Sequence, residues 1–124
     1  MASYPFVHIE ISAKDPAASS KFYSDLCGWK IDVDPRYNYY QFSTGAQGAL
    51  AGAFTQTDGE TYRPGDIIPY IGTDDIDAML KKVQELGGKV LLPKTEIQGV
   101  GWFAFFSDPA GNRIGLFGRL PQSG

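Results

Sequence analysis

The sequence of 124 residues predicts an α+β fold built from two copies of one βαβββ unit. The first observation behind this prediction is an internal repeat, because residues 13–31 align without a gap on residues 73–91 at a constant offset of 60. The second is that each copy contains one helical pattern, and the third is that short strand-like segments separated by turn residues accompany each helix. Since repeats of one supersecondary unit have the same order of elements, we expect the two halves to be structurally equivalent.

Each predicted helix has a start signal and a stop signal at equivalent places in the repeat. Asp15 and Asp75 stand at the N-cap positions, and Pro16 suits the first helical position of the first copy. Gly28 follows the first helical pattern, and Gly87-Gly88 ends the second. Apolar residues with helical spacing predict the faces that pack on the sheets: Ala18, Phe22, Tyr23 and Leu26 in the first copy, and Ile76, Met79, Leu80, Val83 and Leu86 in the second.

The strand signals flank these helices in the same order in both copies. We expect strands over residues 5–12, 29–33, 38–43 and 48–55 in the first copy, and over residues 67–72, 88–92, 101–107 and 112–118 in the second. A polar stretch over about 56–66 connects the copies and is too short to separate independent domains. The prediction is therefore one domain over residues 1–124, with modules at about 4–55 and 67–119.

Composition and charge exclude several classes of partner. The net charge of −3, from 11 basic and 14 acidic residues, provides no basic surface for nucleic acid. No apolar run reaches the roughly 20 residues of a membrane helix, and the start lacks the features of a signal peptide, so we expect a soluble, cytoplasmic protein. Cys27 is the only cysteine and cannot form an internal disulfide, which agrees with a reducing compartment. A small molecule is the expected partner.

The only histidine, His8, lies in the stretch FVHIEI over residues 6–11. On an alternating strand it shares one face with Phe6 and Glu10. An imidazole two residues from a carboxylate could be a metal ligand, a general base or a structural residue, and these alternatives stay open on the local pattern alone.

Two segments resemble the vicinal-oxygen-chelate superfamily, which includes glyoxalase I, bleomycin-resistance proteins and extradiol dioxygenases. They are HIEISAKDPAASSKFYSDLCGWKI over 8–31 and FAFFSDPAGNRIGLFG over 103–118, and the resemblance covers essentially the whole chain. Within that superfamily the sequence is most similar to small glyoxalase-related bacterial proteins that lack most metal ligands. The resemblance implies the glyoxalase/bleomycin-resistance fold, in which tandem modules form curved mixed sheets around a cavity.

The resemblance also implies where metal ligands would stand. Metalloenzymes of the glyoxalase type place one ligand on the first strand and one on the last strand of each module. These positions correspond here to His8, Gly52, Ile68 and Gly115. Only His8 has a donor atom, and one imidazole does not hold a divalent ion against water, so we expect no metal and no other cofactor.

Side-chain alternation from these four positions predicts the cavity wall. The expected ligand-binding residues are Phe6, His8, Glu10, Leu50, Phe54, Ile68, Tyr70, Arg113 and Phe117. A largely apolar and aromatic wall with a few polar groups is typical of a small-molecule pocket.

Three functions fit these expectations. The first is a metal-free protein that sequesters or senses an aromatic or amphipathic ligand, as bleomycin-resistance proteins do. The second is an enzyme, a lactoylglutathione-lyase-like isomerase or a dioxygenase, that depends on a metal or uses His8 and Glu10 as an acid–base pair. The third is a role in assembly alone. The resemblance further implies a homodimer, with the cavity formed within one chain or across two.

Overall fold

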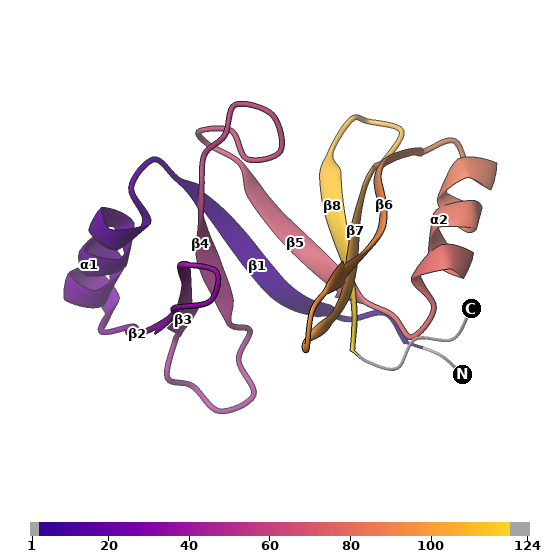
Figure 1. Cartoon of the computed structure of the whole chain (residues 1–124). Coiled ribbons are helices and arrows are strands. Elements are labelled where there is room, and N and C mark those ends of the chain that lie inside the picture. The colour runs from indigo at the N-terminus through magenta and orange to yellow at the C-terminus, as the bar shows by residue number, and fades with distance from the viewer. Residues whose placement is uncertain (1–2, 120–124) are drawn as a thin grey trace. The chain divides into compact units, whose positions relative to one another are not determined.

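The computed structural model describes residues 3–119, which form two compact units. The chain passes from one unit to the other between Val7 and His8 and between Ile68 and Pro69, so that residues 8–68 form the first unit and residues 3–7 and 69–119 form the second. The order of elements is βαβββ twice (Figure 1). The elements are β1 (Phe6–Ala13), α1 (Pro16–Cys27), β2 (Lys30–Asp34), β3 (Tyr39–Ser43), β4 (Gly52–Gln56), β5 (Ile67–Gly72), α2 (Ile76–Glu85), β6 (Lys89–Ile97), β7 (Gly101–Ser107) and β8 (Arg113–Arg119). The predicted fold class is confirmed.

The first unit is a four-stranded sheet in the order β2-β3-β4-β1 with α1 packed on one face. Asp15 caps α1 by accepting hydrogen bonds from two backbone N–H groups, and Gly28 ends it in the left-handed conformation at φ 74°. The core between helix and sheet is aromatic. Tyr23 of α1 stacks on Phe54 with ring centroids 5.4 Å apart, and Trp29 stacks on Phe42 at 4.6 Å.

The face of α1 that meets the sheet differs from the predicted one. Pro16, Ser20 and Tyr23 point toward the core, at spacings of four and three residues. Phe22 and Leu26 were expected there and are instead 58% and 66% exposed. The predicted apolar face of α1 was too wide. Tyr23 lies on the part that faces the sheet, whereas Phe22 and Leu26 lie on the part that faces away from it.

The second unit repeats this plan with the strand order β5-β8-β7-β6 and α2 packed against β6, β7 and β8. Asp75 caps α2 by accepting a hydrogen bond from the backbone N–H of Ala78. The buried core on this side contains Ile76, Leu80, Ala104 and Leu116. The equivalent N-caps agree with the ungapped repeat in the sequence.

Strand β6 is longer than the predicted segment 88–92 and continues through Pro93 to Ile97. Proline cannot donate to a sheet, but β6 is the edge strand of its unit and its pairing with β7 shifts register on either side of Leu92. An edge position with local bulges tolerates a proline that a central strand would exclude.

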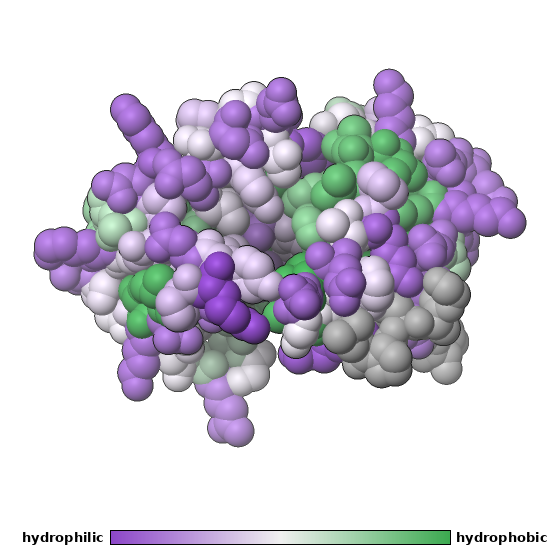
Figure 2. All heavy atoms as spheres, viewed as in Figure 1, coloured by the Kyte–Doolittle hydropathy of each residue, from purple (hydrophilic) through white to green (hydrophobic). Residues whose placement is uncertain are grey.

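In the view of Figure 2, hydrophilic residues make up most of the outline and hydrophobic residues form smaller areas between them. Neither α1 nor α2, the helices found between residues 3 and 119, is long and apolar enough to cross a bilayer.

Candidate functional site

Strand β1 separates its side chains into a core face and an opposite face. Ile9, Ile11 and Ala13 pack into the cluster under α1. His8 and Glu10 therefore project from the face of the sheet that α1 does not cover. The sequence analysis predicted that these two residues share one face, and the structure agrees with this prediction.

The hydroxyl group of Tyr39 lies between His8 and Glu10. It donates a hydrogen bond to Glu10 Oε2 over 2.8 Å, and its oxygen lies 2.9 Å from His8 Nε2. Because the single hydroxyl proton is directed to Glu10, His8 Nε2 is the donor in the second hydrogen bond. The imidazole is thereby fixed in the tautomer with its proton on Nε2 and its lone pair on Nδ1. The two rings are nearly parallel, at 23°, with centroids 6.4 Å apart.

Small residues on β4 allow Tyr39 to reach across the sheet. Tyr39 is on β3 and its two partners are on β1, with β4 between these strands. On the side where His8 and Glu10 lie, β4 presents Ala53, which pairs with Glu10 on β1 and with Gln41 on β3. A methyl group leaves room for the phenol ring to pass over β4. A larger side chain at position 53 would obstruct this path.

Burial sets the protonation states of this group. Burial lowers the pKa of His8 below its ordinary value, so the imidazole is neutral at neutral pH. Burial also raises the pKa of Tyr39 strongly, and the negative charge of Glu10 and the hydrogen bond to it raise it further. Tyr39 therefore keeps its proton. Glu10 is only 5% exposed, so the phenol supplies a hydrogen bond to a carboxylate that is largely removed from water.

A cavity of about 490 Å³ lies at one end of this sheet, all of it within the first unit. Its lining residues are His8, Lys30, Ile31, Asp32, Gln41, Phe42, Ser43, Ala51 and Gly52. His8 is thus part of the cavity wall and also a member of the hydrogen-bonded chain with Tyr39 and Glu10.

On strand β4, the residues predicted for the cavity wall lie on the opposite face of the sheet. The pairing of Ile9 with Gly52 and of Ile11 with Phe54 places both β4 residues on the face toward α1. Phe54 is a core residue, 1% exposed, and not a neighbour of His8 on the wall. Leu50 precedes the strand, which begins at Gly52 and not at residue 48. The alignment that placed Gly52 on the face of His8 was wrong by one residue, although Gly52 borders the cavity at the strand end.

The remaining predicted positions lie on β1, β5 and β8. Phe6 is 55% exposed, and Ile68 is buried. Tyr70 pairs with Gly115 and Gly72 pairs with Phe117, while Leu116 packs under α2. By alternation Arg113, Gly115 and Phe117 therefore share the face of β8 that is turned away from α2. None of the predicted positions on β5 and β8 is among the residues that line the cavity bordered by His8.

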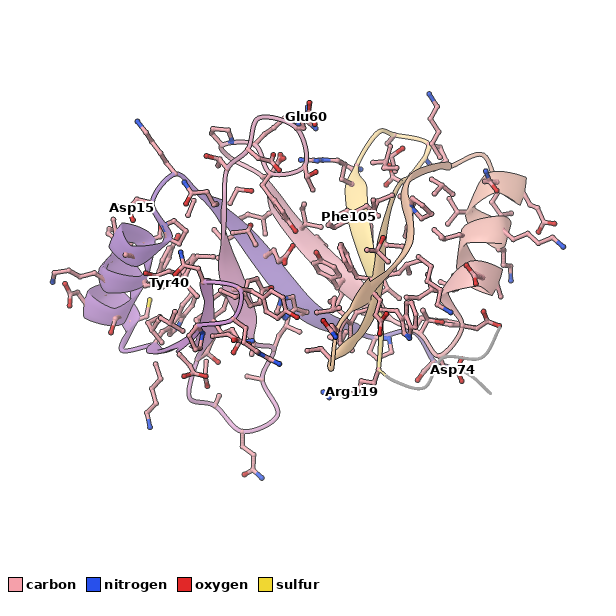
Figure 3. All side chains as sticks on the ribbon, in the orientation of Figure 1. Asp15, Tyr40, Glu60, Asp74, Phe105 and Arg119 are labelled. Carbon is pink, nitrogen blue, oxygen red and sulfur yellow. The ribbon has the colours of Figure 1, made fainter. Side chains whose placement is uncertain are left out.

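In the second unit an aromatic ring occupies the space over Gly115. A Cβ atom at Gly115 would lie 2.4 Å from Cδ2 of Tyr70, so the tyrosine ring rests directly on the glycine. Tyr70 in turn packs near Phe105, with ring centroids 5.7 Å apart, and Phe105 contacts Phe103 edge to face at 5.6 Å. Phe105 lies on the side of β7 away from α2 (Figure 3). This face is aromatic and offers no carboxylate at position 115.

The residues present do not fit a metal ion of the glyoxalase type. Nε2 of His8 is engaged by Tyr39, Ile68 has no donor atom, and Tyr70 covers Gly115. On β4 the residue beside Glu10 is Ala53, which has no donor atom either. Within residues 3–119 no group of three or more His, Cys, Asp and Glu side chains is close enough to hold a metal ion.

Sequence reasoning did not identify Tyr39, and of the residues that line the cavity it named only His8 and Gly52. Tyr39 lies in the aromatic stretch YNYY over 37–40, where Tyr40 points toward α1 and packs in the core (Figure 3). Alternation predicts that neighbouring tyrosines face opposite sides of a sheet. The pattern alone does not indicate that Tyr39 reaches His8, which is 31 residues away in sequence.

Similar proteins agree with this fold and with the sequence resemblance. The chain is 34% identical to the anthracycline biosynthesis protein DnrV of Streptomyces peucetius, over 93% of this chain and 47% of that protein. It is 32% identical to a glyoxylase-like domain-containing protein of Didymella fabae, over 84% of this chain and 85% of that protein. The chain spans about half the length of the first curated relatives it matches.

Solved structures show the same fold at low sequence identity. The hypothetical protein BH1468 of Bacillus halodurans superposes with a TM-score of 0.74 at 16% identity, covering 99% of both chains. A glyoxalase/bleomycin resistance protein/dioxygenase superfamily member from Vibrio splendidus superposes with a TM-score of 0.65 at 15% identity, covering 94% of this chain and 99% of that one. The sequence profile of this superfamily matches residues 6–116. With that match over most of its length, the chain belongs to the Glyoxalase/Bleomycin resistance protein/Dioxygenase superfamily.

Proposed function

We propose that this chain binds a planar aromatic or amphipathic small molecule, without a metal ion, in the cavity bordered by His8. The observation that carries the proposal is the position of His8, which lines the cavity while its ring is hydrogen-bonded to Tyr39, which in turn donates to Glu10. A neutral imidazole in one tautomer presents a flat ring with a defined hydrogen-bonding pattern. Such a group suits an aromatic ligand that carries polar substituents.

The size and chemistry of the cavity support this proposal. Its volume of about 490 Å³ falls within the roughly 300–1,000 Å³ of small-molecule sites. Phe42 and Ile31 supply apolar contacts, whereas Gln41 and Ser43 supply hydrogen-bonding groups. A ligand with an apolar ring system and polar edges would satisfy both kinds of lining.

The names of the relatives support the same class of ligand. DnrV and a second relative, DauV of a Streptomyces strain, are named as anthracycline biosynthesis proteins. Anthracyclines are polycyclic aromatic compounds that carry ketone and hydroxyl oxygens. Because the chain matches only about half of these relatives, their names favour a ligand class for it and no particular reaction.

Titration with anthraquinone-2-sulfonate, a water-soluble planar probe, tests the proposal. Trp29 stacks on Phe42, which lines the cavity, so tryptophan fluorescence is expected to change on binding. We expect saturable binding by the wild type and at least about tenfold weaker binding by His8→Ala, a loss of about 1.4 kcal/mol. Lys81→Ala, at an exposed position of α2, serves as the control and should bind as the wild type does. No saturable binding up to the solubility limit, or equal affinity in His8→Ala, would overturn the proposal.

A second candidate function is acid–base catalysis, and the chain from Glu10 through Tyr39 to His8 favours it. A base held in one tautomer by a second group that is itself oriented is the arrangement used by general-base enzymes. This reading predicts that the protein exchanges the proton next to the carbonyl of a small α-hydroxyketone in D₂O, measured by NMR. Exchange at the uncatalysed rate, or at the same rate in His8→Ala, would contradict it.

A further inference from the structure

Two charged side chains of the edge strand β2, Lys30 and Asp32, line the cavity but have no part in the site described above. Ile31 between them packs in the core under α1. Lys30 and Asp32 therefore project from the opposite face of the sheet, which also carries His8. No ion pair within residues 3–119 uses either of them, so both charges are available to a ligand in the cavity.

Lys30 and His8 stand at the two ends of one row of residues that crosses the sheet. Lys30 of β2 pairs with Ser43 of β3. Continuing the register of β3, β4 and β1, the next residues of this row are Ala51 and His8. We call these four residues the His8 row, and all four line the cavity. Because Ala51 and Ser43 have short side chains, the middle of the row leaves space for a flat ring between the two larger end groups.

The neighbouring row of residues is covered over β4 and β1. Its members, in order from β2 to β1, are Asp32, Gln41, Ala53 and Glu10. The phenol of Tyr39 passes over Ala53 to reach Glu10, and none of these three residues lines the cavity. A ligand that lies across the sheet therefore follows the His8 row, and its far end meets Lys30.

We infer that the bound aromatic molecule carries a carboxylate or sulfonate group at the end opposite His8, and that Lys30 pairs with this anionic group. This inference rests on the proposed function and specifies the charge of the ligand. Three strand spacings separate Lys30 from His8, about 14 Å between Cα atoms, so the ligand is elongated. The hydroxyl group of Ser43, directly opposite Lys30, can donate a hydrogen bond to the same anion.

Two ligands of nearly the same shape and different charge test the inference. Anthraquinone-2-carboxylate is an anion at neutral pH, whereas anthraquinone-2-carboxamide is uncharged. An ion pair at an exposed lysine has a modest effect, about fivefold in affinity. We therefore expect the wild type to bind the carboxylate about fivefold more tightly than the carboxamide, measured by tryptophan fluorescence at low ionic strength. High salt should reduce this preference, because it screens exposed charges.

Three variants assign the preference to one side chain. Lys30→Met removes the charge and keeps most of the length of the side chain, so it should bind both compounds with nearly equal affinity. Asp32→Asn removes a negative charge from the same wall and should bind the carboxylate at least as tightly as the wild type. Lys14→Met is the matched control, because Lys14 is an exposed lysine of the same unit that does not line the cavity, and it should keep the preference. All three positions are exposed, so the melting temperatures should stay at the wild-type value.

The outcomes separate this inference from the proposed function. Equal binding of both compounds by the wild type, or a carboxylate preference that persists in Lys30→Met, would overturn the inference and leave the proposed function standing. Tighter binding of the carboxamide than of the carboxylate would also overturn it, because the negative charge of Asp32 would then outweigh Lys30 at this end of the cavity. If the wild type binds neither compound, both proposals are wrong.

Discussion

Replacing Tyr39 with phenylalanine removes one oxygen atom and breaks two hydrogen bonds at once. The hydrogen bond to the Glu10 carboxylate over 2.8 Å is of the charged kind, which contributes about 1.5–3 kcal/mol. The hydrogen bond with His8 contributes about 1 kcal/mol more. Since Glu10 is 5% exposed, water does not easily replace the phenol. We therefore expect Tyr39→Phe to lower the free energy of unfolding by about 3 kcal/mol, which corresponds to roughly 10 °C in melting temperature for a domain of this size.

Urea unfolding followed by circular dichroism at pH 7.5 measures this loss, and Tyr40→Phe is the matched control. Tyr40 is the next residue on β3, packs on the side of α1 and makes no side-chain hydrogen bond that we find within residues 3–119. Its hydroxyl should contribute less than about 0.5 kcal/mol. If Tyr39→Phe costs no more than Tyr40→Phe, the hydrogen-bonded chain does not stabilise the protein as argued here.

Three further predictions concern charge, metal and core packing. Because burial lowers the pKa of His8, the unfolded state takes up a proton first, so stability should fall as the pH decreases from about 6.5 through the lower folded-state pKa. His8→Gln should flatten the dependence of the melting temperature on pH between about 7.5 and 5, and an unchanged slope in this variant would assign the effect to another group. Adding Zn²⁺, Ni²⁺ or Fe²⁺ should not raise the melting temperature, because an ion that binds only the folded state must stabilise it; a rise that His8→Ala abolishes would restore the metal site. Phe54→Ala should cost about 3–5 kcal/mol in chemical unfolding, since Phe54 is 1% exposed in the core, whereas a small loss of stability with loss of ligand binding would return Phe54 to the cavity wall.

Local patterns in the sequence were sufficient to predict the order and type of the helices and strands. The equivalent caps at Asp15 and Asp75 and the constant offset between the copies depend on local patterns, which do not require knowledge of distant contacts. Alternation along β1 was also enough to separate His8 and Glu10 from the core residues beside them. These features are local because a helix cap and the alternation of side chains along a strand each depend on a few adjacent residues.

Which side chains meet at the site could not be predicted from local patterns, because it depends on contacts between distant strands. Alternation divides a strand into two faces, but the register between strands decides which faces coincide, and a shift of one residue exchanges them. In the structure Ile11 pairs with Phe54 and Glu10 pairs with Ala53. Phe54 therefore belongs to the core, and Ala53 lies beside Glu10. The approach of Tyr39 to Glu10 and His8 joins residues 29 and 31 positions apart across an intervening strand, so it depends on strand order and on a small residue at position 53.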